Sequence, residues 1–137
     1  MPKVLRIDHV AVLVDDLEKT LSFWRDALGM ELSHVEEVPA EKSVVAFLPV
    51  GSSEVELVKP TTADSGLARY LEKRGPGMHH ICLEVDDLDA TLAELAAQGV
   101  ELIDRAPRPG AHGRIAFIHP KGSHGVLIEL LERSSGA

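Results

Sequence analysis

Several features that would assign a protein class are scarce in this chain of 137 residues. The one cysteine, Cys82, cannot form an internal disulfide, which is typical of a reducing compartment. The surrounding stretch MHHICLEV is apolar, so we expect Cys82 to be a small buried hydrophobe. The chain also lacks an apolar run long enough to cross a bilayer and an N-terminal signal-peptide pattern. We therefore expect a cytoplasmic protein with no membrane partner.

Positive charge is scarce as well. The chain has 14 Lys and Arg residues against 22 Asp and Glu residues, a formal net charge of −8 at pH 7. This balance argues against a general basic surface, so we expect no nucleic-acid partner. A local basic patch for an anionic small molecule remains open, because four cations lie in the second half: Arg105, Arg108, Arg114 and Lys121. Neither a glycine-rich phosphate loop nor a Ser–His–Asp arrangement is evident.

What the chain does contain is an internal repeat. Residues 7–14 (IDHVAVLV) match residues 78–85 (MHHICLEV), and each copy is followed by Asp-Asp-Leu. Further on, GMEL matches GVEL and VELV matches IELL, and the offsets between the copies are 71, 70 and 73 residues. The two halves therefore run nearly in step, and a single doubling excludes a solenoid, which needs at least three units.

Hydrophobic periodicity predicts the same elements in each half. In the first half we expect a strand at 7–14, a helix capped by Asp15 or Asp16 and ended by Gly29, and strands at 30–38, 44–50 and 55–60. In the second half we expect a strand at 78–85, a helix capped by Asp86 or Asp87 and ended by Gly99, and strands at 100–107, 113–120 and 125–132. A short helix at about 65–73 joins the halves. Each half is predicted to be βαβββ.

Two histidines and two glutamates occupy equivalent places in the repeat. His9 and His80 lie in the opening strands, and Glu56 and Glu129 lie inside the apolar closing strands. An ionised carboxylate among apolar neighbours is unfavourable unless it is paired, hydrogen-bonded or bound to a metal. Taken singly, each of these residues fits an ordinary core, turn or surface role equally well. Their symmetry as a set, and imidazole and carboxylate chemistry, predict a site for Zn, Co, Ni, Mn or Fe.

These residues and three longer strings carry a resemblance to a known family. The strings are GMHHICLEVDDLDATLAEL, RYLEKRGPG and RPGAHGRIAFIHPKGSHGVLIELLE. The chain resembles the vicinal oxygen chelate superfamily over about residues 5–132 and, within it, the epimerases that act on 2-methylmalonyl thioesters of coenzyme A. The implied fold class is α+β, with two paired βαβββ modules forming a curved mixed sheet around a metal-containing cavity. The implied domain is single, 1–137, with modules at 5–60 and 78–132 and a linker at 61–77.

The resemblance also implies an activity and its ligands. One divalent metal, cobalt favoured over zinc, manganese or nickel, would be bound by His9, Glu56, His80 and Glu129. It would chelate the substrate's carboxylate and thioester oxygens and stabilise the enolate that forms when the α-proton leaves. The local basic patch could then meet the phosphates of coenzyme A. A homodimer is expected, with the first helix or the opening strands at the contact.

The expected catalytic base is where the sequence departs from the family. A string like PEQGV is usual after the second strand, and ungapped alignment places Ala40 at its glutamate. Glu41, one residue later, is our candidate base, with Glu36 and Glu37 as alternatives. Glu129 could supply a second acid–base group.

Other functions stay open on the same scaffold. A lactoylglutathione lyase of the glyoxalase I type would use much the same ligands, and an extradiol dioxygenase would use two histidines and one carboxylate. From a different class, a drug-binding resistance protein would often lack the ligands, and all four are present here.

Overall fold

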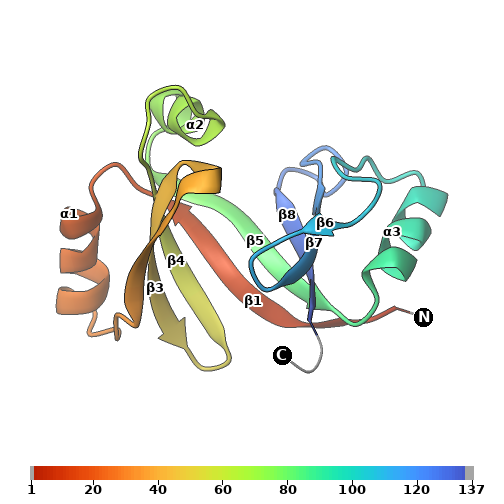
Figure 1. The fold of residues 1–137 in the computed structure, drawn as a ribbon, viewed down its shortest axis with the longest axis horizontal. Helices are drawn as coiled ribbons and strands as arrows, with labels where there is room; N and C mark the ends of the chain where they lie inside the picture. Colours follow the sequence, from red (N-terminus) through yellow and green to blue (C-terminus); the bar gives the residue numbers. More distant parts are fainter. Residues whose placement is uncertain (1, 135–137) are drawn as a thin grey trace. The chain divides into compact units, whose positions relative to one another are not determined.

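The computed structural model describes residues 2–134, and its elements follow the predicted order (Figure 1). The first half contains β1 (Val4–Leu13), α1 (Leu17–Leu21) with a π-helical continuation (Ser22–Ala27), β2 (His34–Val38), a 3-10 turn (Pro39–Glu41), β3 (Ser43–Val50) and β4 (Ser53–Pro60). The second half contains α2 (Gly66–Arg74), β5 (Gly77–Val85), α3 (Leu88–Ala97), β6 (Arg108–Pro109), β7 (Gly113–Ile118) and β8 (Ile128–Arg133).

The described chain forms two compact units, each containing a run of four hydrogen-bonded strands. The first unit is residues 9–79, and the second is residues 1–8 together with 80–137. The strand order is β2-β3-β4-β1 in the first unit and β5-β8-β7-β6 in the second. The pairs β1–β4 and β5–β8 are parallel, and the other pairs within each unit are antiparallel. The predicted α+β class and doubled βαβββ pattern are confirmed.

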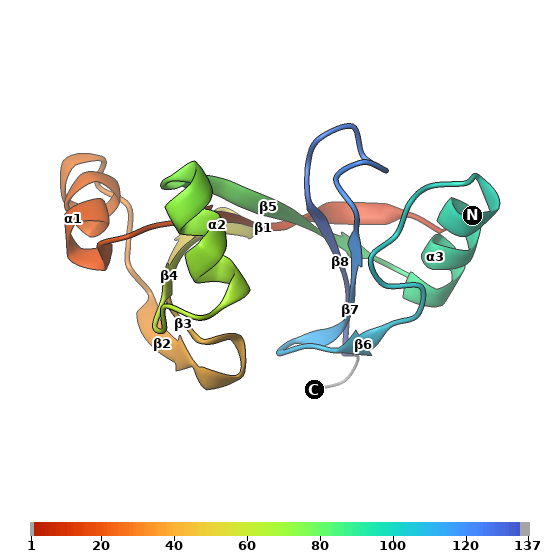
Figure 2. The ribbon, with the colours of Figure 1, turned by 90° about the horizontal axis from the view of Figure 1, so that it is seen from above.

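In the first unit, a helix covers one face of the sheet (Figure 2). Asp16 caps α1, because its side chain accepts a hydrogen bond from the backbone N–H of Lys19. Leu21 is 1% exposed and belongs to a core cluster of five buried residues: Val14, Leu21, Ala46, Leu48 and Leu57. Trp24 packs against this cluster.

The second unit repeats this packing. Asp87 caps α3 by accepting from the backbone N–H of Ala90. Leu88 and Leu92 of α3 pack into a core with Val85, Ala116, Ile118 and Leu130. Cys82 is fully buried, as predicted, in a smaller cluster on the other side of the sheet with Ile115 and Leu131.

The strand predicted at 100–107 is wrong. Only Leu102 forms an isolated bridge there, with Ile118, and the ladder strand is β6 instead. The chain turns at Asp104, whose backbone N–H donates to the carbonyl of Phe117 and whose carboxylate accepts from the N–H of Phe117. This side chain takes the place of a ladder partner, so the strand cannot continue. Likewise β2 begins at His34 rather than Met30, because Met30 packs in the core behind Trp24.

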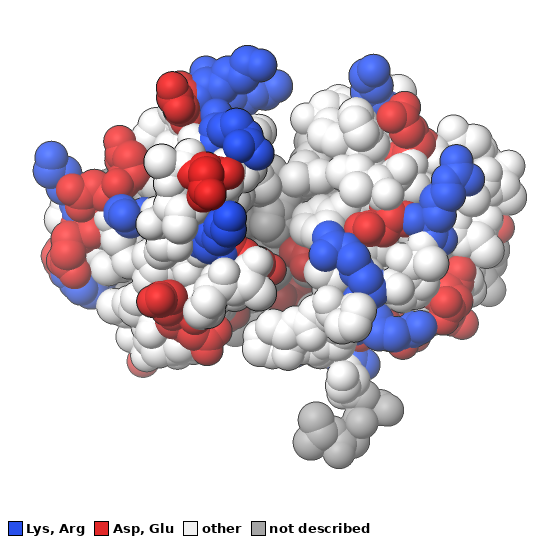
Figure 3. Space-filling model, turned by 45° about the horizontal axis from the view of Figure 1, so that its top comes forward, with Lys and Arg blue, Asp and Glu red and all other residues white. Residues whose placement is uncertain are grey.

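Within residues 2–134, the structure contains no helix that is long and apolar enough to span a membrane. In Figure 3, Lys and Arg side chains are interspersed with Asp and Glu over the face in view rather than gathered in one basic field. This agrees with the prediction that the protein has no general basic surface.

Within the second unit, a largely buried ion network joins the start of β1 to β5 and β8. Asp8 is 5% exposed and accepts from Arg6 at 2.9 Å and from Arg133. Glu84 accepts from Arg6 Nε at 2.8 Å and lies 3.4 Å from Arg133 Nε. Burial acts to lower the pKa of Arg133, but the hydrogen bond and charge of Asp8 outweigh it, so the pKa is raised. The network fixes the residue that immediately precedes His9.

We predict that Asp8→Ala destabilises the protein by about 2 kcal/mol, because Arg6 and Arg133 lose a buried charged acceptor but keep Glu84. The free energy of unfolding from urea titration measures the effect. The matched control is Asp26→Ala, which removes an exposed pair with Arg25 and is expected to leave the unfolding midpoint unchanged. Equal midpoints for both variants would contradict a structural role for the network.

A second prediction concerns the hydroxyl of Ser43. Among the described residues, its Oγ is the one buried side-chain nitrogen or oxygen atom without a hydrogen-bond partner. Ser43→Ala removes an unsatisfied polar atom, so we expect stabilisation of about 1 kcal/mol in urea unfolding. Ser33→Ala, at an exposed site, is the control and is expected to be neutral. A lower midpoint for Ser43→Ala would show that the hydroxyl has a partner in solution.

Candidate metal and acyl-binding site

Each unit places one predicted histidine against one predicted glutamate. In the first unit, β1 and β4 pair in parallel with Ala11 opposite Glu56, which leaves His9 two residues along the same face. The His9 Nδ1 and Glu56 Oε2 atoms are 3.2 Å apart. Their side chains are 11% and 16% exposed, so both groups are largely withdrawn from water.

The second unit repeats this geometry in the same register. Cys82 lies opposite Glu129 in the parallel pair β5–β8, and His80 again stands two residues before the paired position. His80 Nε2 is 3.0 Å from Glu129 Oε1, and both side chains are 14% exposed. The repeat found in the sequence thus corresponds to a repeated side-chain arrangement, one His–Glu pair in each unit.

A phenylalanine accompanies each pair, which the sequence analysis did not single out. Phe47 of β3 lies opposite Glu56, and Phe117 of β7 lies opposite Glu129. His80 meets Phe117 edge-on with ring centroids 5.8 Å apart, and His34 stacks on Phe47 at 4.4 Å. The repeated Ala-Phe in the strings VVAF and RIAF is the signal that could have found them.

The two pairs fit a divalent metal by donor type and by spacing. Ligand atoms each about 2.1 Å from an ion are about 3.0 Å apart at a right angle and about 3.4 Å apart at the tetrahedral angle. The observed separations within the pairs are 3.2 Å and 3.0 Å. In each unit the imidazole nitrogen and the carboxylate oxygen are therefore spaced as neighbouring ligands of one ion would be.

The three candidate bases take different places near the end of β2. Glu36 pairs with Val45, which sets it on the face that carries Phe47 and Glu56. Glu37 pairs with Val44, on the opposite face. Glu41 is the last residue of the 3-10 turn and is exposed. Lys42 then adopts a left-handed conformation with φ 52°, where the family string carries glycine.

The remaining histidines do not join the pairs. His79 packs edge-on against Tyr70 with ring centroids 4.9 Å apart. His119 accepts through Nδ1 from the backbone N–H of Lys121 and lies 3.8 Å from Glu101. Both contacts are structural roles outside the candidate site.

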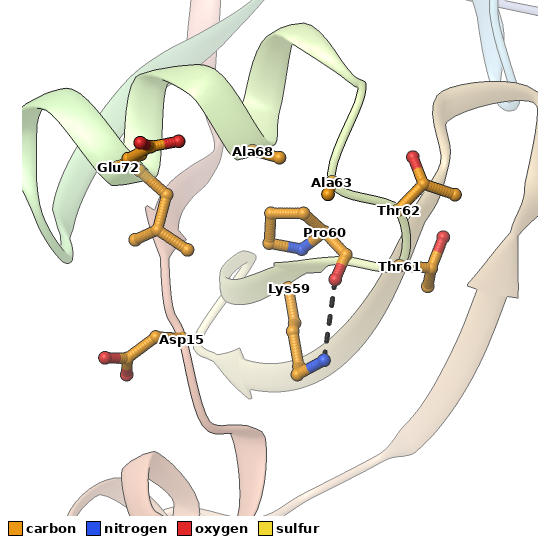
Figure 4. A pocket seen from close by; sticks show the side chains of 9 residues that line it. Asp15, Lys59, Pro60, Thr61, Thr62, Ala63, Ala68 and Glu72 are labelled. Carbon is orange, nitrogen blue, oxygen red and sulfur yellow. Dashed lines mark hydrogen bonds between the residues drawn. The ribbon is translucent and has the colours of Figure 1, made fainter.

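Two pockets lie away from the His–Glu pairs. One, of about 380 Å³ in the first unit, is bordered by the end of β4 and by α2 (Figure 4). Lys59 in it is three residues from Glu56 on the same strand, so its side chain points to the opposite face. The other pocket, of about 490 Å³ in the second unit, is lined by residues of the β6–β7 hairpin, including Arg108 and Arg114. It contains two of the four cations predicted to form a basic patch.

Comparisons with known proteins agree with this geometry. The mitochondrial methylmalonyl-CoA epimerase of Mus musculus is 41% identical over 130 residues, which cover 93% of this chain and 73% of that protein. YqjC of Bacillus subtilis, an uncharacterized protein, is 44% identical over 128 residues, covering 93% and 91% of the two chains. A solved methylmalonyl-CoA epimerase in complex with methylmalonyl-CoA and NH4+ is similar with a TM-score of 0.85 and 36% identity, over 97% of each chain.

The family model for the glyoxalase/bleomycin resistance protein/dioxygenase superfamily matches residues 8–117, which contain both histidines of the pairs and Glu56. The resemblance inferred from the repeat is confirmed. By its doubled βαβββ fold, its two His–Glu pairs and these matches, the chain belongs to the glyoxalase/bleomycin resistance protein/dioxygenase superfamily.

Proposed function

We propose that this chain is an isomerase that epimerises methylmalonyl-CoA at the α-carbon of its acyl group. The observation that carries the proposal is the His–Glu pair repeated in the same register in both units. Sequence relatives and solved structures similar over nearly the whole chain are methylmalonyl-CoA epimerases. An acyl-CoA is accordingly the substrate class. We further propose that residues 1–137 work as one domain and that the protein acts in the cytoplasm.

His9, Glu56, His80 and Glu129 are the side chains that we propose to hold one divalent metal. Cobalt is favoured, with zinc, manganese and nickel as alternatives, because imidazole and carboxylate donors suit all four. When bound, the ion supplies Lewis-acid polarisation of the thioester carbonyl, which acidifies the neighbouring α-proton. Burial of the donors supports this role, since each carboxylate is only 14–16% exposed and needs a cationic or hydrogen-bonding partner there.

Epimerisation needs a proton to leave one face of the α-carbon and another to arrive on the opposite face. We propose Glu41 as the base that takes the proton, with Glu129 as the group that handles the proton on the other face. Glu36 is the strongest alternative to Glu41, because the β2–β3 register sets it on the face of Glu56. Glu37 lies on the opposite face and is disfavoured.

A homodimer is part of the proposal. Three apolar side chains of β1 are exposed: Val4 at 59%, Leu5 at 53% and Ile7 at 46%. Phe23 beside α1 is 54% exposed. Exposed apolar groups close together on an opening strand and on the first helix support a contact with a second copy at one of these places.

A glyoxalase-type isomerase is the second candidate, because the same four donors would serve it. A non-catalytic binding protein is disfavoured by the spacing of those donors. Exchange of the substrate α-proton separates the first candidate from both alternatives.

Proton NMR of racemic methylmalonyl-CoA in D2O, with the cobalt-loaded protein, tests the function directly. We expect metal-dependent loss of the α-proton signal, and retention of that signal after the protein is treated with a chelator. A protein that holds metal but exchanges no α-proton would contradict epimerisation and favour glyoxalase-type chemistry. A protein that neither holds metal nor exchanges the proton would favour the binding-protein candidate.

The proposed base is tested by glutamine substitutions. We expect Glu41→Gln to lower the exchange rate of one epimer by about 10²–10⁴-fold, as loss of a general base does. Glu37→Gln is the matched control, and its exchange rate is expected to equal that of the unmodified protein. A normal rate in Glu41→Gln combined with a slow rate in Glu36→Gln would transfer the role of base to Glu36.

A further inference from the structure

The two units differ at one equivalent position beside their His–Glu pairs. In the first unit, Glu36 lies opposite Val45, two residues before the phenylalanine that faces Glu56. In the second unit, Arg108 lies opposite Ile115, two residues before the phenylalanine that faces Glu129. The same place in the repeat thus carries a carboxylate in one unit and a guanidinium in the other.

The contacts of Arg108 aim it at the face of the second His–Glu pair. Its Cζ lies 5.4 Å from the centroid of the Phe117 ring, and that ring also contacts His80. Its Nε donates to Asp104 Oδ1 at 3.2 Å. Asp104 is in turn held by the backbone N–H of Phe117 at 2.8 Å. The guanidinium is therefore positioned by a ring on one side and by an anchored carboxylate at Nε.

The two terminal nitrogens of Arg108 keep their donors available. Among the described residues, Asp104 is the hydrogen-bond acceptor for Arg108, and it accepts only from Nε. The side chain is 50% exposed and borders the pocket of about 490 Å³. A planar guanidinium group whose terminal N–H donors are unused can bind a carboxylate through two parallel hydrogen bonds.

Arg108 is also within reach of the reacting end of an acyl group. Two strand spacings of about 4.8 Å and one two-residue step of about 6.8 Å place the Cα atoms of Arg108 and Glu129 about 12 Å apart. An extended arginine side chain covers much of that distance. A small group held beside Glu129 would therefore lie within reach of its terminal nitrogens, whereas the phosphates of a coenzyme would lie at the far end of such a substrate.

Arg114 provides the contrast that makes this assignment specific. It borders the same pocket and is 44% exposed, but its Nη2 is bound to Asp89 at 2.7 Å and to Glu132 at 3.0 Å. It follows Gly113 by one residue and precedes Ile115, so it lies on the face opposite Ile115 and Phe117. Arg114 thus uses a terminal nitrogen in its ion pairs, whereas the ion pair of Arg108 uses only Nε.

We propose that Arg108 binds the free carboxylate of the acyl group and makes the site selective for acyl thioesters that carry one. The inference rests on the proposed function for the identity of the acyl thioester. It adds a specificity residue in the second unit, opposite in charge to the candidate base Glu36 at the equivalent position in the first.

Isothermal titration of the cobalt-loaded protein with two ligands tests the proposal. Methylmalonyl-CoA carries the free carboxylate, and propionyl-CoA lacks it but keeps the coenzyme. We expect Arg108→Gln to weaken binding of methylmalonyl-CoA about 30-fold, as loss of a charged hydrogen-bond pair does, and to leave binding of propionyl-CoA unchanged. Arg108→Lys is expected to restore part of the loss, because it keeps the charge without the fork.

Arg114→Gln is the matched control, and its affinity for both ligands is expected to equal that of the unmodified protein. Equal weakening of both ligands by Arg108→Gln would overturn the proposal and assign Arg108 to the coenzyme phosphates. No weakening of either ligand would overturn it as well. Selective weakening in a protein that exchanges no α-proton would retain Arg108 as a carboxylate site and reject the epimerase function, so the two failures are distinguishable.

Discussion

The parallel pairing of an opening strand with a closing strand is the constraint on which the candidate site depends. In β1–β4 and in β5–β8, the histidine stands two residues before the position opposite the glutamate. Because side chains alternate at a period of two, a slip of one residue in either ladder would turn one member of a pair to the other face. The turns, caps and helices of each unit all serve to hold this register.

Burial follows from the same alternation. On the second sheet, the face of His80 and Glu129 continues with a layer of apolar side chains, Cys82 and Leu131 among them. Beyond that layer lie Glu84 and Arg133 of the ion network. Polar groups on this face are therefore separated by an apolar layer. Each lies beside a partner that offsets part of its loss of hydration, His80 beside Glu129 and Glu84 beside Arg133.

Each unit contains one copy of this arrangement, but the residues around the two copies differ. The residue two before each phenylalanine is paired across the sheet with Glu36 in the first unit and with Arg108 in the second. The connection after α1 leads into a five-residue strand and a 3-10 turn, whereas the connection after α3 turns back at Asp104 into a strand of two residues. The two units therefore differ in charge at this position, which is acidic in the first unit and basic in the second.

The sequence by itself determined the doubled pattern, the order of strands and helices outside residues 100–107, an aspartate cap for each long helix, and the four residues of the two pairs. Each of these depends on local periodicity or on a repeat that can be read without knowing which strands are neighbours. The structure then identified Asp16 and Asp87 among the two aspartates predicted for each cap. The prediction from sequence failed at residues 100–107. The β-branched and apolar residues there favour a strand, but the Asp104 side chain accepts the backbone hydrogen bond of Phe117 that a neighbouring strand would otherwise accept.

Only the tertiary structure decided which side chains share a face with the pairs. Phe47 and Phe117 are ordinary core residues in the sequence, and Arg108 is one of four cations in a loop-rich stretch. Cross-strand register places the phenylalanines beside the two glutamates, and within residues 2–134 Arg108 forms its hydrogen bond through Nε alone. Register between strands distant in the sequence is set by packing and by turns, so no pattern within a single strand could have specified it.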